Sequence, residues 1–582
     1  MLMKTLQDKD IRSLMLAPAK NVGTFKMVKG IMSAIANGRG QSGGVPRHIL
    51  PSIWRQLGSR KAVVTHDGFC TYEEYAARVT KLANSFHQQG INEGDRVATL
   101  LRNEQAWFDV MGAAMASGIK MPMLNIHLKP HELVQCVNAC APKALVFSEQ
   151  YLEIVESIRS EIVSVQYFVV AGKGKYGEGF IALEDWIQQG QDELPPGGFG
   201  VAQMPFSGGS TGVPKFIVDG DTKPKDNPLM KGVNKETLND LKFKFARGFA
   251  RLGLGSIKGP IVSMIPGPLY HSGVQTAVFP IFMGATIVPM YKFDAEDFLA
   301  QIEKEKVNWV FVAPTMLERV LKLPKEVKAK YNLSSMQVVL CAAAPCPARV
   351  KQEINQLFKA QGAKGDVFNE YYGSSEASII TVLRAEDYEH HPHRYKSVGK
   401  VCGSDCRIYN MEKGEWAKPN EEGHVLVRNS RIYNVNYGNS DEMKKSFLDI
   451  DGAYWYDDGC IGYLDEDEFL YLTSRSKEMI ISGGVNIFPV EIEEVIKSHD
   501  DVIDAAVIKM PDPDLGEVPA AVIQLKPSLS MTDADLTAYC KENGLYGFKL
   551  PKQIKFVEEL PRNTAGKIRK VDLEKEFTAE TA

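Results

Sequence analysis

Short apolar segments alternate with helix-forming segments along much of the chain, and this alternation is the strongest constraint on its fold. Predicted strands such as Lys61–Thr65 and Arg96–Leu101 are followed by predicted helices such as Trp107–Ser117. Further along, Val307–Ala313 and Met336–Ala342 are predicted strands of mostly apolar residues. Strands joined through helices pair in parallel, and apolar strands need cover on both faces. The sequence therefore predicts an α/β protein built from layered sheets.

The chain of 582 residues is too long for one hydrophobic core, so we expect several units. Residues 1–45 form an N-terminal extension, in which Lys20–Ile35 predicts a basic amphipathic helix that packs on the protein or rests on a membrane surface. Residues 46–476 form a large domain ending in a small β-barrel-like unit of short alternating strands. Residues 477–582 predict a small, mobile α+β domain.

Composition excludes several classes of protein. The net charge of −4 gives no indication of nucleic-acid binding. We expect no transmembrane segment and no signal peptide. Nine cysteines without a secretory signal predict reduced thiols in the cytoplasm. Three close cysteine pairs (136/140, 341/346 and 402/406) are interpreted as buried apolar residues, and the histidines of 390–393 as a solvated loop, rather than as metal sites.

A glycine-rich stretch at 207–215 is the first candidate binding site. Glycine backbones can approach a ligand closely, and successive backbone N–H groups form a nest for anions. Hydroxyls and a lysine add donors and charge, so a polyphosphate ligand is predicted, although an ordinary surface loop is the alternative. The spacing fits neither the Walker loop nor the dinucleotide fingerprint. The candidate contacts are Ser207, Gly208, Gly209, Ser210, Thr211, Gly212 and Lys215.

Three further segments carry candidate residues. Glu370–Glu376 combines aromatic rings that can stack on a base, hydroxyls that can bind phosphate and a carboxylate that can hold Mg²⁺. His271 lies on a loop after the predicted strand Pro260–Ile265, where α/β proteins place ligands, although a lone histidine is more often structural. Lys567 lies in a glycine-containing loop that would, by itself, be a solvated basic loop.

Five motifs in sequence order resemble those of the acyl-adenylate-forming superfamily, which includes acyl-CoA synthetases, the adenylation domains of peptide synthetases and beetle luciferases. The resemblance spans about residues 47–575. It implies an ATP- and Mg²⁺-dependent carboxylate–CoA ligase that forms an acyl adenylate and then a thioester with coenzyme A. The motifs are the 207–215 loop, Tyr372–Glu376, Gly459–Asp465, Arg475–Glu493 and Pro561–Lys567.

The resemblance also implies roles for single residues. The 207–215 loop would grip the β- and γ-phosphates, while Glu376 and Ser210 hold Mg²⁺. Lys567 would bridge the substrate carboxylate and the α-phosphate, and His271 would gate the acyl pocket. The remaining nucleotide and coenzyme A contacts would come from Ala343, Ala344, Pro345, Tyr371, Tyr372, Gly373, Ser374, Ser375, Arg475, Gly483 and Gly484.

Rotation of the C-terminal domain would then exchange two elements of the site. Lys567 would face the site during adenylation, and the double glycine at 483–484 would replace it when the coenzyme A thiol enters. The resemblance implies an acid–thiol ligase acting on a fatty or other bulky hydrophobic acid. A separate carrier protein as acyl acceptor, homodimer formation and peripheral membrane contact stay open.

The chain departs from the family pattern at the position that usually binds the ribose of ATP. Cys460 stands where the family usually has an aspartate that binds both ribose hydroxyls, and a thiol is a poor acceptor. Asp458 or Asp457 could take over this contact. If neither does, we expect weak ATP binding or a non-catalytic nucleotide- or acyl-binding protein.

Overall fold

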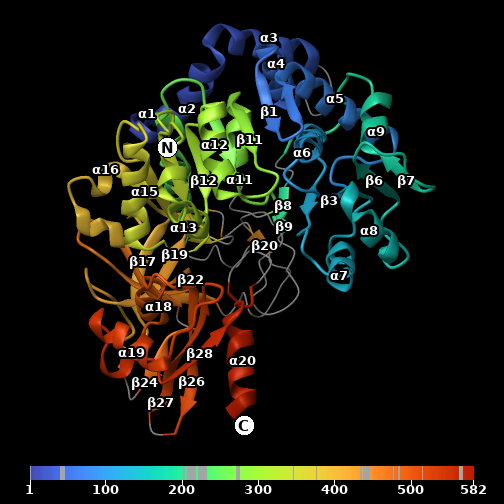
Figure 1. Cartoon of the computed structure of the whole chain (residues 1–582). Helices are drawn as coiled ribbons and strands as arrows, with labels where there is room; N and C mark the ends of the chain where they lie inside the picture. The colour runs from blue at the N-terminus through green and yellow to red at the C-terminus, as the bar shows by residue number, and fades with distance from the viewer. Residues whose placement is uncertain are drawn as a thin grey trace.

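The computed structural model describes residues 2–39, 46–200, 203–205, 218–219, 233–270, 275–344, 346–374, 377–430, 432, 435–436, 446–475, 478–482, 485–513, 515–562 and 568–581. Within these ranges, no helix is long and apolar enough to cross a membrane. Figure 1 shows the N-terminal helices at one end of the molecule and the C-terminal helix at the other.

The largest sheet has nine strands and confirms the predicted parallel pairing. Its order is β16-β15-β14-β13-β12-β10-β11-β1-β2, and the strands from β14 to β1 pair in parallel, whereas β2, β15 and β16 are antiparallel additions at the edges. The strands are β1 (Lys61–Thr65), β2 (Gly68–Thr71), β10 (Val262–Ile265), β11 (Thr286–Pro289), β12 (Trp309–Val312), β13 (Val338–Cys341), β14 (Phe368–Ser374), β15 (Ser378–Leu383) and β16 (Lys400–Val401).

A second sheet of six parallel strands has the order β7-β6-β5-β3-β4-β8. Helices α5 (Tyr72–Gln88) and α6 (Gln105–Ser117) supply much of the core between the two sheets, and every residue of α6 after Gln105 is buried. A helix buried on all sides needs apolar or small residues almost all round, and the one charged residue of α6, Asp109, pairs with Arg78 at 2.7 Å. The strands are β3 (Val97–Leu100), β4 (Met121–Met123), β5 (Ala144–Ser148), β6 (Tyr167–Ala171), β7 (Phe180–Ala182) and β8 (Gln203–Pro205).

The predicted β unit is an antiparallel sheet of six strands. β22 lies between β19 and β21 and also pairs with β23, so it is the central strand of the unit. The strands are β17 (Asp405–Asn410), β18 (Glu415–Trp416), β19 (Gly423–Arg428), β21 (Phe447–Ile450), β22 (Ala453–Leu464) and β23 (Leu470–Arg475).

The C-terminal part combines a five-stranded sheet with three helices, as an α+β unit. Lys322 Nζ donates a hydrogen bond of 3.3 Å to the Ile503 carbonyl and so joins the large part to it. The predicted boundary at 476/477 falls on residues outside the described ranges, and the division into 1–45, 46–476 and 477–582 stays a prediction. The elements are β24 (Ile480–Ser482), β25 (Val485–Ile487), β26 (Val502–Asp512), β27 (Gly516–Leu525), β28 (Gln553–Val557), α18 (Pro489–Lys497), α19 (Asp533–Glu542) and α20 (Lys570–Thr581).

The N-terminal extension contains α1 (Leu2–Gln7), α2 (Lys9–Val22) and α3 (Thr24–Gly38). The prediction of one helix over Lys20–Ile35 is therefore wrong. The chain breaks at Gly23, whose φ of +92° is open to glycine but costly for other residues. After the break, α3 packs on α4 (Pro46–Leu57).

Candidate active site

The described candidate residues gather where β13 ends and β14 continues. After β13 the chain turns through Ala343, whose φ is +78°, a left-handed conformation that costs an alanine about 1 kcal/mol or more. Parallel pairing places Cys341 opposite Glu370, so Ala343 and Ala344 follow beside Tyr371 and its successors. Antiparallel pairing with β15 extends β14 through Ser374, so the segment that carries Tyr371 and Tyr372 is a strand.

Tyr372 links β14 to the central strand of the β unit. Its hydroxyl donates a hydrogen bond to the Oδ2 atom of Asp458 in β22. Burial raises the pKa of Tyr372 well above its ordinary value, and the Asp458 carboxylate raises it further. The phenol therefore stays protonated and acts as a donor, which orients the Asp458 carboxylate beside the strand that carries the other candidate residues.

Asp457 and Cys460, which lie on either side of Asp458 and Gly459 in the sequence, have different surroundings. Asp457 lies 3.1 Å from the Nδ1 atom of His424 and accepts a hydrogen bond of 2.9 Å from the Gly459 backbone. Cys460 is buried beside the apolar cluster of the β unit, its thiol contacts the Tyr372 hydroxyl, and its backbone pairs in register with Arg475 of β23. Of the two aspartates that could replace the family's ribose ligand, Asp458 is thus the one held against the Tyr372 strand.

Tyr371 points away from its neighbour, because side chains alternate along a strand. Its hydroxyl contacts Thr276 of α11 (Gln275–Val278), and its ring centroid lies 6.2 Å from that of Phe311. Burial raises the pKa of Tyr371 to about 12. Tyr371 packs against the core between the two large sheets, whereas Tyr372 packs against the β unit.

Asn103, which belongs to none of the sequence motifs, ties the carboxyl ends of the two large sheets together. It follows β3, is buried, and donates hydrogen bonds of 2.7 Å to the Gly267 carbonyl and 2.9 Å to the Met290 carbonyl. Its Oδ1 atom accepts a 3.0 Å bond from the Leu269 backbone. Asn103 therefore holds the loop after β10, which leads to His271. In the sequence, its position directly after a predicted strand is the feature that points to a place at the site, because ligand-binding loops begin there.

The comparisons with known proteins agree with this geometry. The model of the AMP-binding enzymes matches residues 52–435, and that of the AMP-binding enzyme C-terminal domain matches residues 491–567. The chain belongs to the AMP-binding enzyme family. Its resemblance to acyl-adenylate-forming proteins, which the motifs predicted, is confirmed.

Two relatives and one solved structure illustrate the similarity. The 3-[(3aS,4S,7aS)-7a-methyl-1,5-dioxo-octahydro-1H-inden-4-yl]propanoyl:CoA ligase of Rhodococcus jostii is 27% identical, over 90% of this chain and 96% of that protein. The feruloyl-CoA synthase of an Amycolatopsis species is 27% identical, over 90% of this chain and 97% of the relative. The structure of o-succinylbenzoate CoA synthetase from Bacillus subtilis, in complex with an acyl-adenylate intermediate, has a TM-score of 0.70 at 25% identity, and covers 90% of this chain and 97% of that one.

Several candidate residues of this AMP-binding enzyme lie outside the described ranges. Their roles stay predictions, although the described elements show how the chain enters and leaves their segments. β8 ends shortly before Ser207, and the Ala377 backbone N–H donates a 3.0 Å bond to Ser374 Oγ, which joins the described residues on either side of 375–376. The residues are Ser207–Lys215, His271, Pro345, Ser375, Glu376, Gly483, Gly484 and Lys567, together with the side chain of Arg475.

The segment that carries Lys567 is anchored on both sides. Arg562 and Ile568 form an isolated β-bridge that closes the loop. Lys570 lies 2.7 Å from Glu493 Oε1 of α18 and 2.9 Å from Glu478 Oε2. Burial disfavours the charged ammonium, but these two carboxylates outweigh burial and raise the pKa of Lys570 above its ordinary value. Lys570 therefore fixes the start of α20 to the segment that follows residues 476–477.

The cysteines and the histidine cluster have the surroundings that their sequence context predicted. All nine cysteines are buried and free, and burial raises the pKa of Cys136 and Cys140 to about 12. The histidines of 390–393 are exposed. In the described part of the chain, no group of three histidine, cysteine or carboxylate side chains could hold a metal ion.

Proposed function

We propose that this chain is an AMP-forming acyl-CoA ligase, an acid–thiol ligase that uses ATP, Mg²⁺ and coenzyme A to activate a bulky hydrophobic carboxylic acid. The observation that carries the proposal is the hydrogen bond between Tyr372 and Asp458. It supplies an oriented carboxylate acceptor for ribose hydroxyls next to the predicted adenine-binding turn, although Cys460 occupies the family's usual position.

Adenylation joins two anions, so the protein's task is mainly to place charge. An oxygen of the substrate carboxylate attacks the α-phosphorus of ATP, the bond from that phosphorus to the bridging oxygen breaks, and pyrophosphate leaves. Lys567 bridges the carboxylate and the α-phosphate, while the 207–215 loop holds the departing phosphates. Asp458 accepts hydrogen bonds from the ribose. Mg²⁺, which prefers oxygen ligands, would be held by Glu376 and Ser210 and would neutralise phosphate charge.

In the second half-reaction the coenzyme A thiol loses its proton, its sulfur attacks the acyl carbonyl, and AMP leaves with the bonding electrons. Rotation of residues 477–582 removes Lys567 from the site and brings in the double glycine at 483–484. Because this rotation forms the two sites one after the other, pyrophosphate and the thiol do not compete for the same space.

The substrate class follows from the relatives' names. The Rhodococcus jostii ligase acts on a propanoyl group that carries an octahydroindenyl ring system, and the Amycolatopsis enzyme on a feruloyl group. We therefore place ring-bearing acids first and fatty acids second. A cytoplasmic location belongs to the same proposal, and the nine free cysteines support a reducing compartment.

Carboxylate-dependent exchange of pyrophosphate into ATP tests the proposal. Ring-bearing, aryl and fatty acids of several lengths are compared, and we expect exchange with at least one acid of the first class. If no acid supports exchange, the chain is a non-catalytic binder and the proposal is wrong. Release of AMP that depends on coenzyme A then separates a coenzyme A ligase from an enzyme that loads a carrier protein.

A further inference from the structure

Helix α3 presents an apolar face to the solvent. Phe25, Val28, Met32 and Ile35 are 80%, 51%, 62% and 42% exposed. They recur at intervals of three and four residues, so they lie along one face of the helix. We call this face, defined by these four residues, the outer face of α3. Isolated exposed apolar residues are ordinary, but an aligned row on one helix indicates a binding surface.

The packing of α3 forces this face outward. Its inner face is closest to the protein at three small, buried residues, Gly30, Ala34 and Gly38. Met27 and Ile31 flank them and pack, partly buried, against the core. A Cβ atom added at Gly30 would lie only 2.8 Å from the Cα atom of Ile53 in α4. Rotating the helix to bury Phe25 and Met32 would therefore push large side chains into a backbone contact that admits only glycine.

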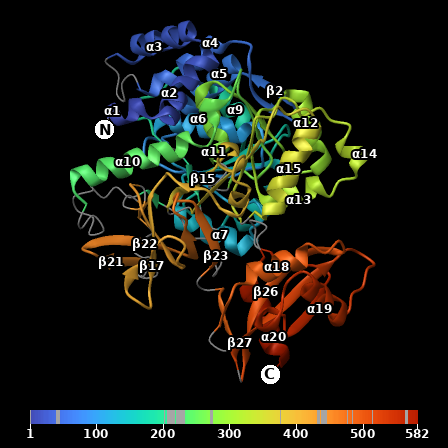
Figure 2. The same cartoon turned by 90° about the vertical axis from the view of Figure 1, so that its left-hand side faces the viewer.

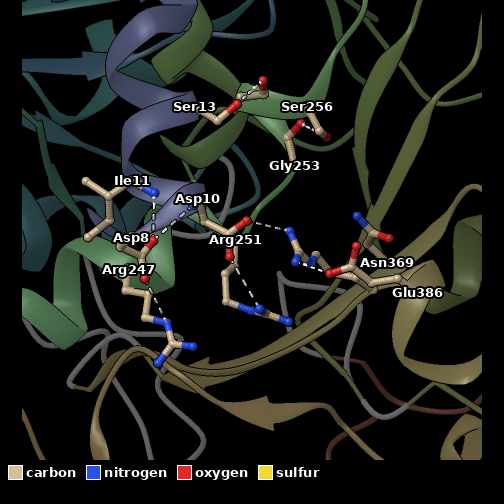
Figure 3. Close-up of polar contacts among 12 residues, drawn as sticks. Asp8, Asp10, Ile11, Ser13, Arg247, Arg251, Gly253, Ser256, Asn369 and Glu386 are labelled. Carbon is tan, nitrogen blue, oxygen red and sulfur yellow. Dashed lines mark hydrogen bonds and ion pairs between the residues drawn. The ribbon is translucent and has the colours of Figure 1, made fainter. Parts of the chain in front are cut away.

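Helix α2 fixes this arrangement to the large part of the protein, as Figure 3 shows. Asp10 lies 3.0 Å from Arg384 and 3.4 Å from Arg251, and Ser13 Oγ donates a 2.6 Å hydrogen bond to the Gly255 carbonyl. Asp8 caps α2 through the backbone N–H groups of Asp10 and Ile11. Because only Gly23 separates α2 from α3, the outer face is a built surface of the protein rather than a loose tail.

The charge around the outer face is positive, although the whole chain carries −4. Between Asp10 and Asp67 the chain has nine lysines and arginines and no aspartate or glutamate. Lys26 and Lys29 belong to α3 itself, and both are exposed. Salt bridges of Lys26 and Lys29 are not found in the described ranges. Of the nine, Arg47 is buried, and Arg55 and Lys61 pair with carboxylates elsewhere. Lys26 and Lys29, exposed beside the apolar row, make the outer face complementary to a surface that is both negative and apolar.

We propose that the outer face of α3 docks on an anionic phospholipid surface, with the helix in the plane of the interface. Phe25 and Met32 would enter the boundary between headgroups and acyl chains, and Lys26 and Lys29 would contact the phosphates. A second copy of the chain fits less well, because a two-fold interface would bring the same lysines of both copies together. Figures 1 and 2 both show α3 at the end of the molecule opposite α19 and α20, so docking there leaves the C-terminal part free.

Sedimentation of the full chain with vesicles tests this proposal. We expect binding to phosphatidylcholine vesicles that contain one quarter phosphatidylglycerol, and weak binding to pure phosphatidylcholine. Phe25→Ser with Met32→Ser should lower the affinity about tenfold or more. Lys26→Gln with Lys29→Gln should lower it about twenty-fivefold, at about fivefold per charge. Val163→Ser, which changes an 86% exposed side chain elsewhere, is the matched control and should bind normally.

Any of three results overturns the proposal. The first is a lack of binding to the anionic vesicles by the unchanged chain, and the second is equal binding by the Phe25/Met32 variant. The third is concentration-dependent self-association that this variant abolishes, which would make the outer face a contact between copies. Pyrophosphate exchange with a soluble acid, measured on the same preparations, reports folding and the proposed activity separately, and we expect it to be unchanged in all three variants.

Discussion

At the scale of single residues, the decisive position is Asp458. A charge-assisted hydrogen bond contributes about 1.5–3 kcal/mol, so Asp458→Asn should raise the KM for ATP about tenfold or more. The reason is that its carboxylate, held by Tyr372, would accept from the ribose. Pyrophosphate exchange at varied ATP concentration measures this change.

Substitutions at Asp457 and Cys460 provide controls for that measurement. Asp457→Asn makes the same chemical change one residue away, where the carboxylate contacts His424 and the Gly459 backbone, and should leave the KM for ATP within about twofold. Cys460→Ala removes a thiol that contacts the Tyr372 hydroxyl but leaves the bond between Tyr372 and Asp458, so it should raise the KM less than Asp458→Asn does. A large increase for Asp457→Asn alone would assign the ribose contact to Asp457.

At the scale of elements, the loop after β10 depends on Asn103. Asn103→Ala would leave the Gly267 and Met290 carbonyls and the Leu269 backbone N–H without this partner, at a cost of about 3 kcal/mol. We expect a lower melting temperature and, in addition, a loss of adenylation, because the same loop carries His271. Thermal unfolding and pyrophosphate exchange follow the two effects.

Asn308 is a matched control at the other end of the same strand. It accepts a 3.0 Å bond from the Val262 backbone and donates one of 2.7 Å to the Pro260 carbonyl, where β10 begins. Asn308→Ala should therefore cost similar stability while adenylation of the folded protein stays near normal. Equal losses of adenylation in both variants would mean that Asn103 acts only through stability.

These elements also show what the sequence can reveal. Lys61–Thr65 is predicted with its observed bounds, because a short run rich in apolar and β-branched residues favours a buried strand. The break at Gly23 is missed, since glycine within an amphipathic pattern is tolerated in helices as well as between them. Asn103 is missed because its partners lie more than 160 residues away. Tyr372 and Asp458 are each proposed from motifs, but their hydrogen bond exists only in three dimensions.

At the scale of the whole molecule, the proposal requires one chain to form two sites in turn. The C-terminal part meets the large part through contacts such as that of Lys322 with Ile503 and carries the anchored segment around Lys567. If it rotates between half-reactions, a change in this segment should damage only the step in which the segment faces the site. A rigid molecule would lose both steps together.

Lys567→Ala makes that distinction measurable. Removing a charge that stabilises a transition state typically costs a factor of about 10²–10³ in rate, so pyrophosphate exchange should nearly vanish. Thioester formation from supplied acyl adenylate and coenzyme A should stay near normal, because Lys567 has left the site by then. Lys570→Met, which breaks the contacts with Glu493 and Glu478, should show a milder form of the same asymmetry, because it loosens the anchor and keeps the lysine. Equal loss of both half-reactions in Lys567→Ala would refute the alternation of domains for this chain.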